Sequence, residues 1–217
     1  GFVNVPNTTL PASPISVPVP PGVAAATYNA TLTVRNSTTG CERNYSINVQ
    51  VLTKPALTPG SITPVCQGAT TALLPYTGAT GGANQYSITW SGAAQTAGFS
   101  NVGLTTLPVS PISIPVPAGV AAGTYLATLT VRNSSTTCDA TYPISVEVLA
   151  LPAITPGTIA AVCQGATTAL LPYTGATGGA NQYSITWSGA AQTAGFSNVG
   201  LTTLSSSPIS IPVPAGV

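Results

Sequence analysis

The side chains in this sequence that could do chemistry are few, and the cysteines are the most numerous reactive ones. The chain contains four cysteines, three acidic residues and no histidine. Nucleophilic catalysis needs a base beside its nucleophile, and a glycosidase needs two carboxylates at one site. The acids Asp139 and Glu147 lie in one predicted hairpin, and Gln50 takes the place of Glu147 in the matching segment 97 residues earlier. The sequence therefore predicts a protein that is not an enzyme.

The four cysteines favour disulfide bonds over a metal site. A zinc site would need more Cys or His ligands close together, and the sequence has neither histidine nor a Cys-x-x-Cys pair. Calcium sites gather several carboxylates around one ion, which three dispersed acids do not supply. We therefore expect an even set of disulfide-bonded cysteines, no metal and no cofactor.

The low charge of the chain excludes further classes of partner. Charged residues make up 3% of the 217 residues, compared with roughly 25% in ordinary soluble domains. Nucleic acid is not an expected partner, because the basic surface that neutralises phosphates is missing. Membrane insertion is not expected either, since Thr, Ser, Gly and Pro interrupt every apolar run before the ~20 residues that a spanning helix needs.

The sequence repeats itself with a period of 97 residues. Residues 65–120 recur as residues 162–217 with two differences. We therefore expect three copies of one module: residues 1–54 as the C-terminal part of a first copy, residues 55–151 as a complete second copy, and residues 152–217 as the N-terminal part of a third. Proline-containing segments at residues 54–60 and 151–157 are predicted to be short, semi-rigid linkers. The first residue is Gly1 and the chain has no methionine, so we expect a piece of a longer protein.

Each copy is predicted to be an all-β, Greek-key sandwich of the immunoglobulin-like type. The period is close to the ~100 residues of one such sandwich and too long for solenoid repeats of ~20–50 residues. In the last hairpin, residues 124–132 and 142–148, apolar and polar residues alternate. Leu126 is replaced by Asn29 in the first copy, so the side of the hairpin that carries Tyr125 is expected to face the core. Shorter strands are predicted at residues 61–65, 70–76, 85–90, 99–102 and 111–116, with a helical turn within residues 91–98.

Aromatic residues are expected to fill this core. Trp90 alternates with Ile88 on a predicted strand, at the usual position of a sandwich-core tryptophan, although stacking on a sugar is an alternative role. Tyr125 opens the penultimate strand, where a tyrosine corner would lie. The predicted core aromatic residues are Tyr28, Trp90, Tyr125 and Trp187.

Two disulfide pairings fit the cysteine spacing. Cys66 would bond either to Cys138 within one copy or to Cys41 across the linker. A strand of about ten residues, roughly 33 Å long, separates Cys41 from the linker, whereas bridged Cα atoms lie within ~7 Å of each other. We therefore predict a bond between Cys66 and Cys138, and partners outside this sequence for Cys41 and Cys163.

Four segments resemble a known class of repeat. These are Val-Cys-Gln-Gly-Ala-Thr-Thr-Ala-Leu-Leu-Pro-Tyr-Thr at 65–77, Gln-Tyr-Ser-Ile at 85–88, Ser-Pro-Ile-Ser-Ile-Pro-Val-Pro at 110–117, and Gly-Thr-Tyr-x-Ala-Thr-Leu-Thr-Val-Arg-Asn-Ser at 123–134. They are similar to the PKD-like or Ig-like modules in giant surface adhesins of Bacteroidota, which are associated with gliding motility and exported by the type IX system. The resemblance covers nearly the whole repeat and implies an extracellular, cell-surface protein.

The repeat and the resemblance together predict a structural role. We expect the copies to form a stalk or filament of a long extracellular adhesin, with other copies of the repeat as partners along the chain and laterally. The alternative is that the repeats themselves bind polysaccharide or another surface ligand through exposed Tyr, Thr and Asn, which makes surface glycans a possible partner.

Overall fold

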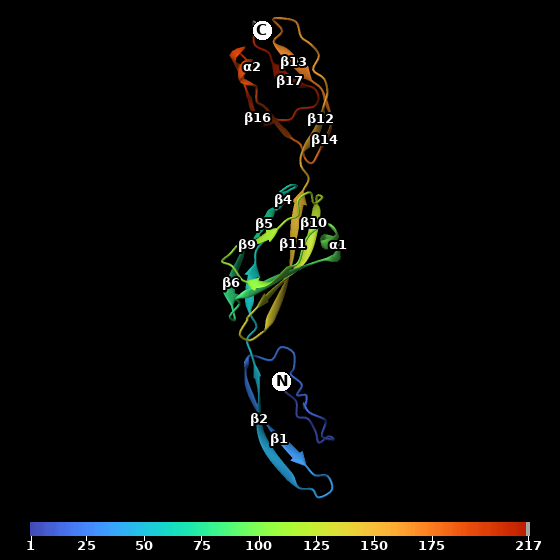
Figure 1. The fold of residues 1–217 in the computed structure, drawn as a ribbon, viewed down its shortest axis with the longest axis vertical. Coiled ribbons are helices and arrows are strands. Elements are labelled where there is room, and N and C mark those ends of the chain that lie inside the picture. Colours follow the sequence, from blue (N-terminus) through green and yellow to red (C-terminus); the bar gives the residue numbers. More distant parts are fainter. Residues whose placement is uncertain (216–217) are drawn as a thin grey trace.

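The computed structural model describes residues 1–215 as three β-structured units that follow one another in a line (Figure 1). They correspond to the three copies of the repeat. The second copy lies in the middle and contains the largest buried core. It therefore shows how a whole repeat folds.

The second copy begins with strand β3 and ends with strand β11. Its elements are β3 Ala56–Pro59, β4 Val65–Cys66, β5 Thr71–Leu74, β6 Tyr76–Thr80, β7 Gln85–Trp90, α1 Gly92–Thr96, β8 Val102–Thr106, β9 Ile112–Pro115, β10 Gly123–Arg132 and β11 Asp139–Leu149.

Two layers form the sandwich. One layer is a five-stranded sheet in the order β4-β11-β10-β7-β8. The facing layer pairs β3 with β6 and β5 with β9, and because only Pro75 separates β5 from β6, these pairs form one staggered three-stranded layer. All these pairings are antiparallel except that of β4 with β11, which is parallel.

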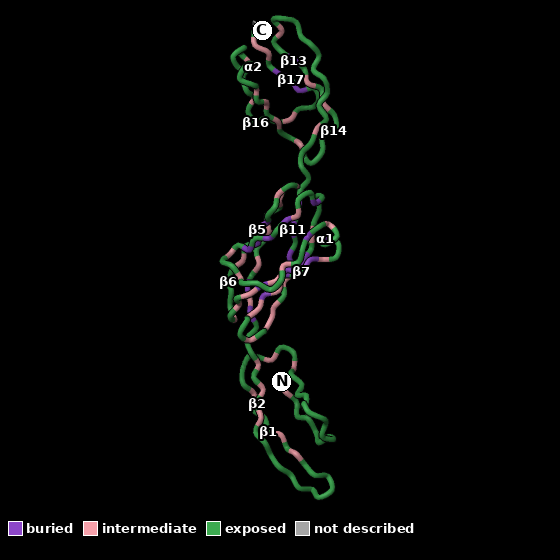
Figure 2. The backbone as a smooth tube through the Cα atoms, viewed as in Figure 1, coloured by how far each residue is buried: buried purple, intermediate pink, exposed green. Residues whose placement is uncertain are grey.

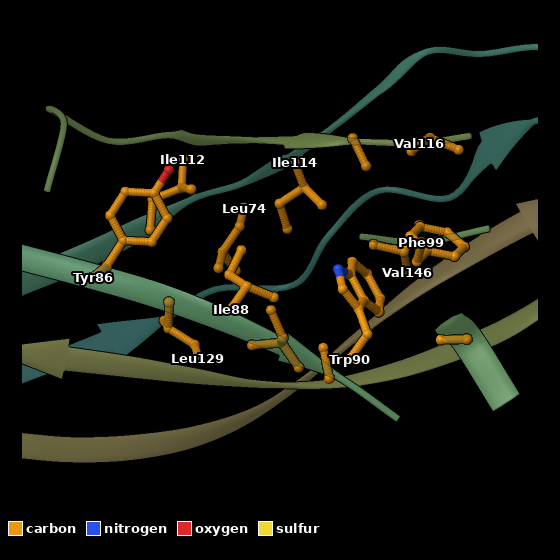
Figure 3. Close-up of a cluster of buried hydrophobic side chains, with 14 of the residues drawn as sticks. Leu74, Tyr86, Ile88, Trp90, Phe99, Ile112, Ile114, Val116, Leu129 and Val146 are labelled. Atoms are coloured by element: carbon orange, nitrogen blue, oxygen red, sulfur yellow. The ribbon is translucent and has the colours of Figure 1, made fainter. Parts of the chain in front are cut away.

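Side-chain alternation explains why the two layers pack together. Along β10, Ala127, Leu129 and Val131 are buried, while Leu126 and Thr128 are exposed. Removing apolar side chains from water is the main favourable term in folding. Figure 3 shows the inward side chains meeting those of the facing layer. The largest fully buried side chains of this core are Leu74, Ile88, Ile112, Ile114, Leu129, Val131 and Val146.

The structure confirms the predicted all-β immunoglobulin-like sandwich and most of its elements. The strand at residues 85–90, the last hairpin and the helical turn all occur where the sequence predicts them. Three expectations were wrong. The segment predicted as linker contains strand β3, and the strand predicted at residues 61–65 is present only as β4 Val65–Cys66. The strand predicted at residues 99–102 lies at Val102–Thr106 instead, because Phe99 is 2% exposed and packs in the core just after the turn at residues 97–98.

The outer copies contain part of the same set of elements, and within the described residues the first copy has no strands matching β8 and β9 and the third has none matching β4. The first copy contains a hairpin of β1 Ala26–Arg35 and β2 Glu42–Val51. The elements of the third copy are β12 Ala153–Pro156, β13 Thr168–Leu171, β14 Tyr173–Thr177, β15 Gln182–Ile185, α2 Gly189–Thr193, β16 Val199–Thr203 and β17 Ile209–Pro212.

Burial is much lower in the outer copies than in the middle one (Figure 2). In the third copy Ala169, Ile209 and Ile211 remain buried, whereas Trp187 is half-buried. In the second copy the hairpin of β10 and β11 belongs to the five-stranded sheet that covers this core. The last hairpin is therefore the element that closes the sandwich.

Candidate functional sites at the repeat junctions

The complete repeat has a proximal pole, where the chain enters from the first copy. The proximal pole consists of residues 54–55, 81–84 and 133–138. Pro55 is almost fully buried there, while its counterpart Pro152 in the third copy is exposed. Gly81 has a φ of +63°, and a Cβ at this position would lie 2.9 Å from the Cα of Pro55 and overlap the carbonyl oxygen of Lys54. The loop and the entering chain thus touch through their backbones.

The turn of the last hairpin completes the proximal pole. The side-chain amide of Asn133 donates a hydrogen bond to the Gly81 carbonyl at 2.9 Å. Asn84 and Ser134 form two more hydrogen bonds, at 2.8 and 2.9 Å. The backbone amide of Asn133 donates to the Cys138 carbonyl at 3.1 Å. These bonds place Cys138 at the pole that faces the preceding copy.

A distal pole lies where the chain leaves the repeat, at residues 65–67 and 149–151. Strand β4 pairs with the end of β11, so that Cys66 lies opposite Leu149. The Gln67 side chain donates to the Val120 carbonyl at 3.3 Å and accepts from the Leu151 amide at 3.4 Å. The distal pole thus ties the departing chain to the end of the sandwich.

The predicted bond between Cys66 and Cys138 is not supported. Cys66 lies beside Leu149 at the last residue of β11, and Cys138 immediately precedes its first residue, Asp139. The eleven residues of β11 separate them by roughly 36 Å, far beyond the ~7 Å limit for a disulfide. The prediction failed because β3 and residues 60–64 carry the chain across the sandwich before Cys66 is reached.

The alternative bond between Cys41 and Cys66 is not supported either, and the outer cysteines are also unbonded. Cys41 precedes the ten-residue strand β2 and lies about one strand length from the first junction. It therefore cannot reach Cys66. Cys163 occupies the position of Cys66 in the third copy and is exposed. All four thiols are free in this structure.

The predicted core aromatic residues form one stack in the second copy. The ring centroids of Trp90 and Phe99 are 4.2 Å apart, and those of Phe99 and Tyr125 are 4.7 Å apart. Trp90 is 3% exposed, so it has no free face for a sugar. The Tyr125 hydroxyl donates to the Ala121 carbonyl at 2.8 Å, which is the bond of a tyrosine corner.

The matching residues of the outer copies lie in less complete surroundings. Tyr28 is half-buried, donates to the Ala24 carbonyl at 2.9 Å and packs against Phe2 at 4.8 Å. Trp187 packs against Phe196 at 4.5 Å and is also half-buried. These residues make the same contacts as their counterparts in the second copy, but their side chains are less buried.

An ion pair closes the last hairpin beside the proximal pole. Arg132 donates two hydrogen bonds to Asp139, from Nε at 2.6 Å and from Nη2 at 2.7 Å. The Arg132 hydrogen bond lowers the pKa of Asp139, against a smaller opposing effect of desolvation. The same bond raises the pKa of Arg132. In the first copy Arg35 and Glu42 form the looser counterpart at 3.6 Å.

We expect this pair to make the stability of the second copy depend on pH. Because the folded-state pKa of Asp139 is depressed, its stabilisation is present above about pH 4, the ordinary range of Asp, and is lost as pH falls through the folded pKa. Asp139→Asn should flatten the pH dependence of unfolding between about pH 5 and pH 2, with Glu147→Gln as the exposed control. Urea unfolding at several pH values measures this. An unchanged slope in Asp139→Asn would contradict it.

A shallow groove runs beside the three-stranded layer. Its volume is about 610 Å³, and its lining includes Pro59, Ile62, Leu126, Tyr142 and Ser145. The Tyr142 hydroxyl accepts a hydrogen bond from the Leu57 amide at 3.1 Å, which fixes the ring. The groove is thus lined by apolar side chains and by polar groups, among them the side chains of Ser61 and Ser145.

Within residues 1–215, no group of three or more His, Cys, Asp or Glu side chains lies close enough to hold a metal ion. Neither helix of that region is long and apolar enough to cross a membrane.

Comparisons with known proteins give one structural neighbour to report. No family model and no curated protein matches the sequence. Among solved structures, the chain is similar to the crystal structure of the FN1–FN3 domains of chicken CNTN1, with 11% sequence identity and a TM-score of 0.39. The match covers 87% of this chain and 68% of that one.

Proposed function

We propose that this chain is a stalk or filament segment of a long extracellular surface adhesin, in which tandem immunoglobulin-like repeats act as spacers. The observation that carries the proposal is the placement of the two poles. The chain enters each repeat at one end of β11 and leaves at the other. Each added repeat therefore lengthens the molecule instead of folding back on it, as the linear arrangement in Figure 1 illustrates.

Fixed junctions support a rod. Buried Pro55 and the close approach of Gly81 hold the entering chain, and Gln67 holds the departing chain. Only residues 150–152 lie between β11 and β12. A linker this short, with a proline in it, restricts the orientation of neighbouring repeats.

The scarcity of charge supports a surface role in which many chains are packed or tethered. Two of the three acids pair with arginines of their own hairpins, so little net field remains to repel neighbouring molecules. The resemblance to repeats of Bacteroidota adhesins supports export to the cell surface and a link to gliding motility.

Small-angle scattering on chains with two, three and four complete copies tests the stalk. One sandwich and its linker should add about 40–45 Å to the maximum dimension per copy. In the control, Leu151→Gly with Pro152→Gly at every junction should reduce that increment, because Gly-rich linkers are flexible. A compact particle whose length does not grow with copy number would overturn the proposal.

Lateral association is the second part of the proposal. On the outer face of the five-stranded sheet, Thr124, Leu126 and Thr128 from β10 and Ser145 from β11 are exposed and uncharged, and one exposed charge, Glu147, lies opposite Thr124. A weak contact made there by one repeat recurs in the next, so that an array multiplies it. We expect the scattering cross-section to widen with concentration. A cross-section that stays equal to that of one sandwich at all concentrations would contradict the lateral contact and remain consistent with the stalk.

The groove beside Tyr142 favours one alternative, in which the repeats bind polysaccharide. Its aromatic ring and its mixture of apolar and polar side chains suit a sugar, although the ring hydroxyl already accepts a hydrogen bond. A glycan array probed with wild type and with Leu126→Ala separates the two roles. Binding lost in Leu126→Ala supports the alternative, and no binding by the wild type opposes it.

A further inference from the structure

The two cysteine positions of the repeat lie at opposite poles. Cys66 is exposed beside Leu149 at the distal pole, and Cys138 is half-buried in the hairpin turn at the proximal pole. One cysteine therefore faces the following repeat and the other faces the preceding repeat. All four cysteines of this sequence are free thiols in the structure.

The junction brings these two positions toward each other. Cys66 lies level with Leu149, and residues 150–152 span at most about 11 Å to the next sandwich. On the other side, the turn that holds Cys138 is bonded through Asn133 to Gly81, which contacts Lys54 and Pro55 of the entering chain. Both cysteine positions thus lie at the poles that the linker joins, Cys66 through its pairing with Leu149 and Cys138 through the hydrogen-bonded turn.

The turn presents its cysteine in a defined position. The Asn133 side-chain oxygen accepts hydrogen bonds from the amides of Ser135 and Thr136, at 2.9 and 3.3 Å. The Thr137 amide donates to the Asn133 carbonyl at 2.8 Å. The first copy has the matching bonds of Asn36 to residues 38 and 39. Both described copies of the turn therefore hold their cysteine in the same way.

We propose that the cysteine at the Cys66 position of each repeat forms a disulfide with the cysteine at the Cys138 position of the repeat that follows. This rests on the proposed tandem array. The partner of Cys66 would be the hairpin cysteine of the third copy, which matches Cys138 and falls after residue 217. The partner of Cys138 would be the β4 cysteine of the first copy, which matches Cys66 and falls before Gly1.

The bond requires a disulfide oxidant such as oxidised glutathione. The thiolate of one cysteine attacks a sulfur of the oxidant, and one glutathione thiolate leaves. The second cysteine thiolate then attacks the resulting mixed disulfide and releases the second glutathione thiolate. Two cysteines lose two protons and two electrons in total, and the oxidant becomes two molecules of reduced glutathione.

Such bonds would change how an interior repeat carries tension. With a bond at each pole, the covalent path across a repeat runs either from residue 55 to residue 66 or from residue 138 to residue 151. Fully extended, these paths measure about 40 Å and 47 Å, compared with about 350 Å for all 97 residues. The shorter path is close to the length of the folded sandwich, so an unfolded interior repeat could hardly lengthen.

Peptide mapping without reduction tests the bond. A copy of residues 121–151 placed after Val217 completes the third copy and supplies its hairpin cysteine. After equilibration with oxidised and reduced glutathione, we expect the Cys66 peptide joined to that added cysteine. Cys66→Ser should abolish the link, and the matched control Cys163→Ser should retain it. A Cys66–Cys138 link, or free thiols under these conditions, would overturn the proposal.

Scattering from the same samples separates this proposal from the stalk. Free thiols in an extended particle would contradict the proposed disulfide and remain consistent with the proposed stalk. A compact particle would contradict the proposed stalk, whether or not the cysteines form disulfides.

Force spectroscopy tests the mechanical consequence. Three consecutive copies of residues 55–151 suit it, because every residue of the buried core cluster lies within one such copy. Under oxidising conditions the middle copy should give no unfolding step of about 300 Å, and a reducing agent should restore that step. A full step from the middle copy in the oxidised array would contradict the proposal.

Discussion

Replacing Leu129 with alanine is expected to destabilise the second copy by about 2–5 kcal/mol. The Leu129 side chain is fully buried at the centre of β10, between β7 and β11. Truncating it removes buried apolar surface and leaves a cavity in the core. A domain of this size has a free energy of unfolding of only about 5–15 kcal/mol. This single substitution should therefore remove a large share of that free energy.

The same strand supplies the matched control. Leu126 is 60% exposed, and Leu126→Ala should change stability by less than about 0.5 kcal/mol. Urea unfolding followed by Trp90 fluorescence in a Trp187→Phe background isolates the second copy, since the chain has two tryptophans. Equal losses for the two leucines would show that the alternation along β10 has been assigned incorrectly.

Replacing Gly81 with alanine is expected to cost about 2–5 kcal/mol. The left-handed backbone at φ +63° costs a non-glycine residue about 1–2 kcal/mol. The added Cβ would also overlap the Lys54 carbonyl oxygen, and such overpacking costs about 1–3 kcal/mol. Since Gly81 lies at the proximal pole, the substitution should also displace the entering chain and alter the angle between copies.

Gly119→Ala separates the two contributions. Gly119 has a similar φ of +77°, but a Cβ there would meet nothing within 4 Å. It should therefore lose only the backbone part, about 1–2 kcal/mol, and leave the scattering curve unchanged. Similar losses at both glycines, with no change in scattering from Gly81→Ala, would argue against a tight contact at the junction.

Local patterns in the sequence were enough to determine the fold of the repeat. The period of 97 residues gave the size of the sandwich, and alternation in residues 124–132 identified the buried face. The substitution of Asn29 for Leu126 showed which side faces water, because a buried position rarely accepts an unpaired amide. The tyrosine corner was also predictable from local sequence, because the Tyr125 hydroxyl donates its hydrogen bond to a carbonyl only four residues away.

Longer-range placement was decided only by the tertiary structure. Nothing in residues 54–66 distinguishes a linker from strand β3, because its pairing with β6 depends on residues 76–80. Only the parallel pairing of β4 with the end of β11 shows that Cys66 has reached the distal pole.

The cysteines show the limit most clearly. Their number and spacing predict disulfide chemistry, but the choice of partner depends on distances that span a whole sandwich. The sequence therefore determined which residues can bond and which strands carry them. The tertiary structure decided that the two cysteines of one repeat lie a strand length apart, because β11 connects the pole of Cys138 to the pole of Cys66.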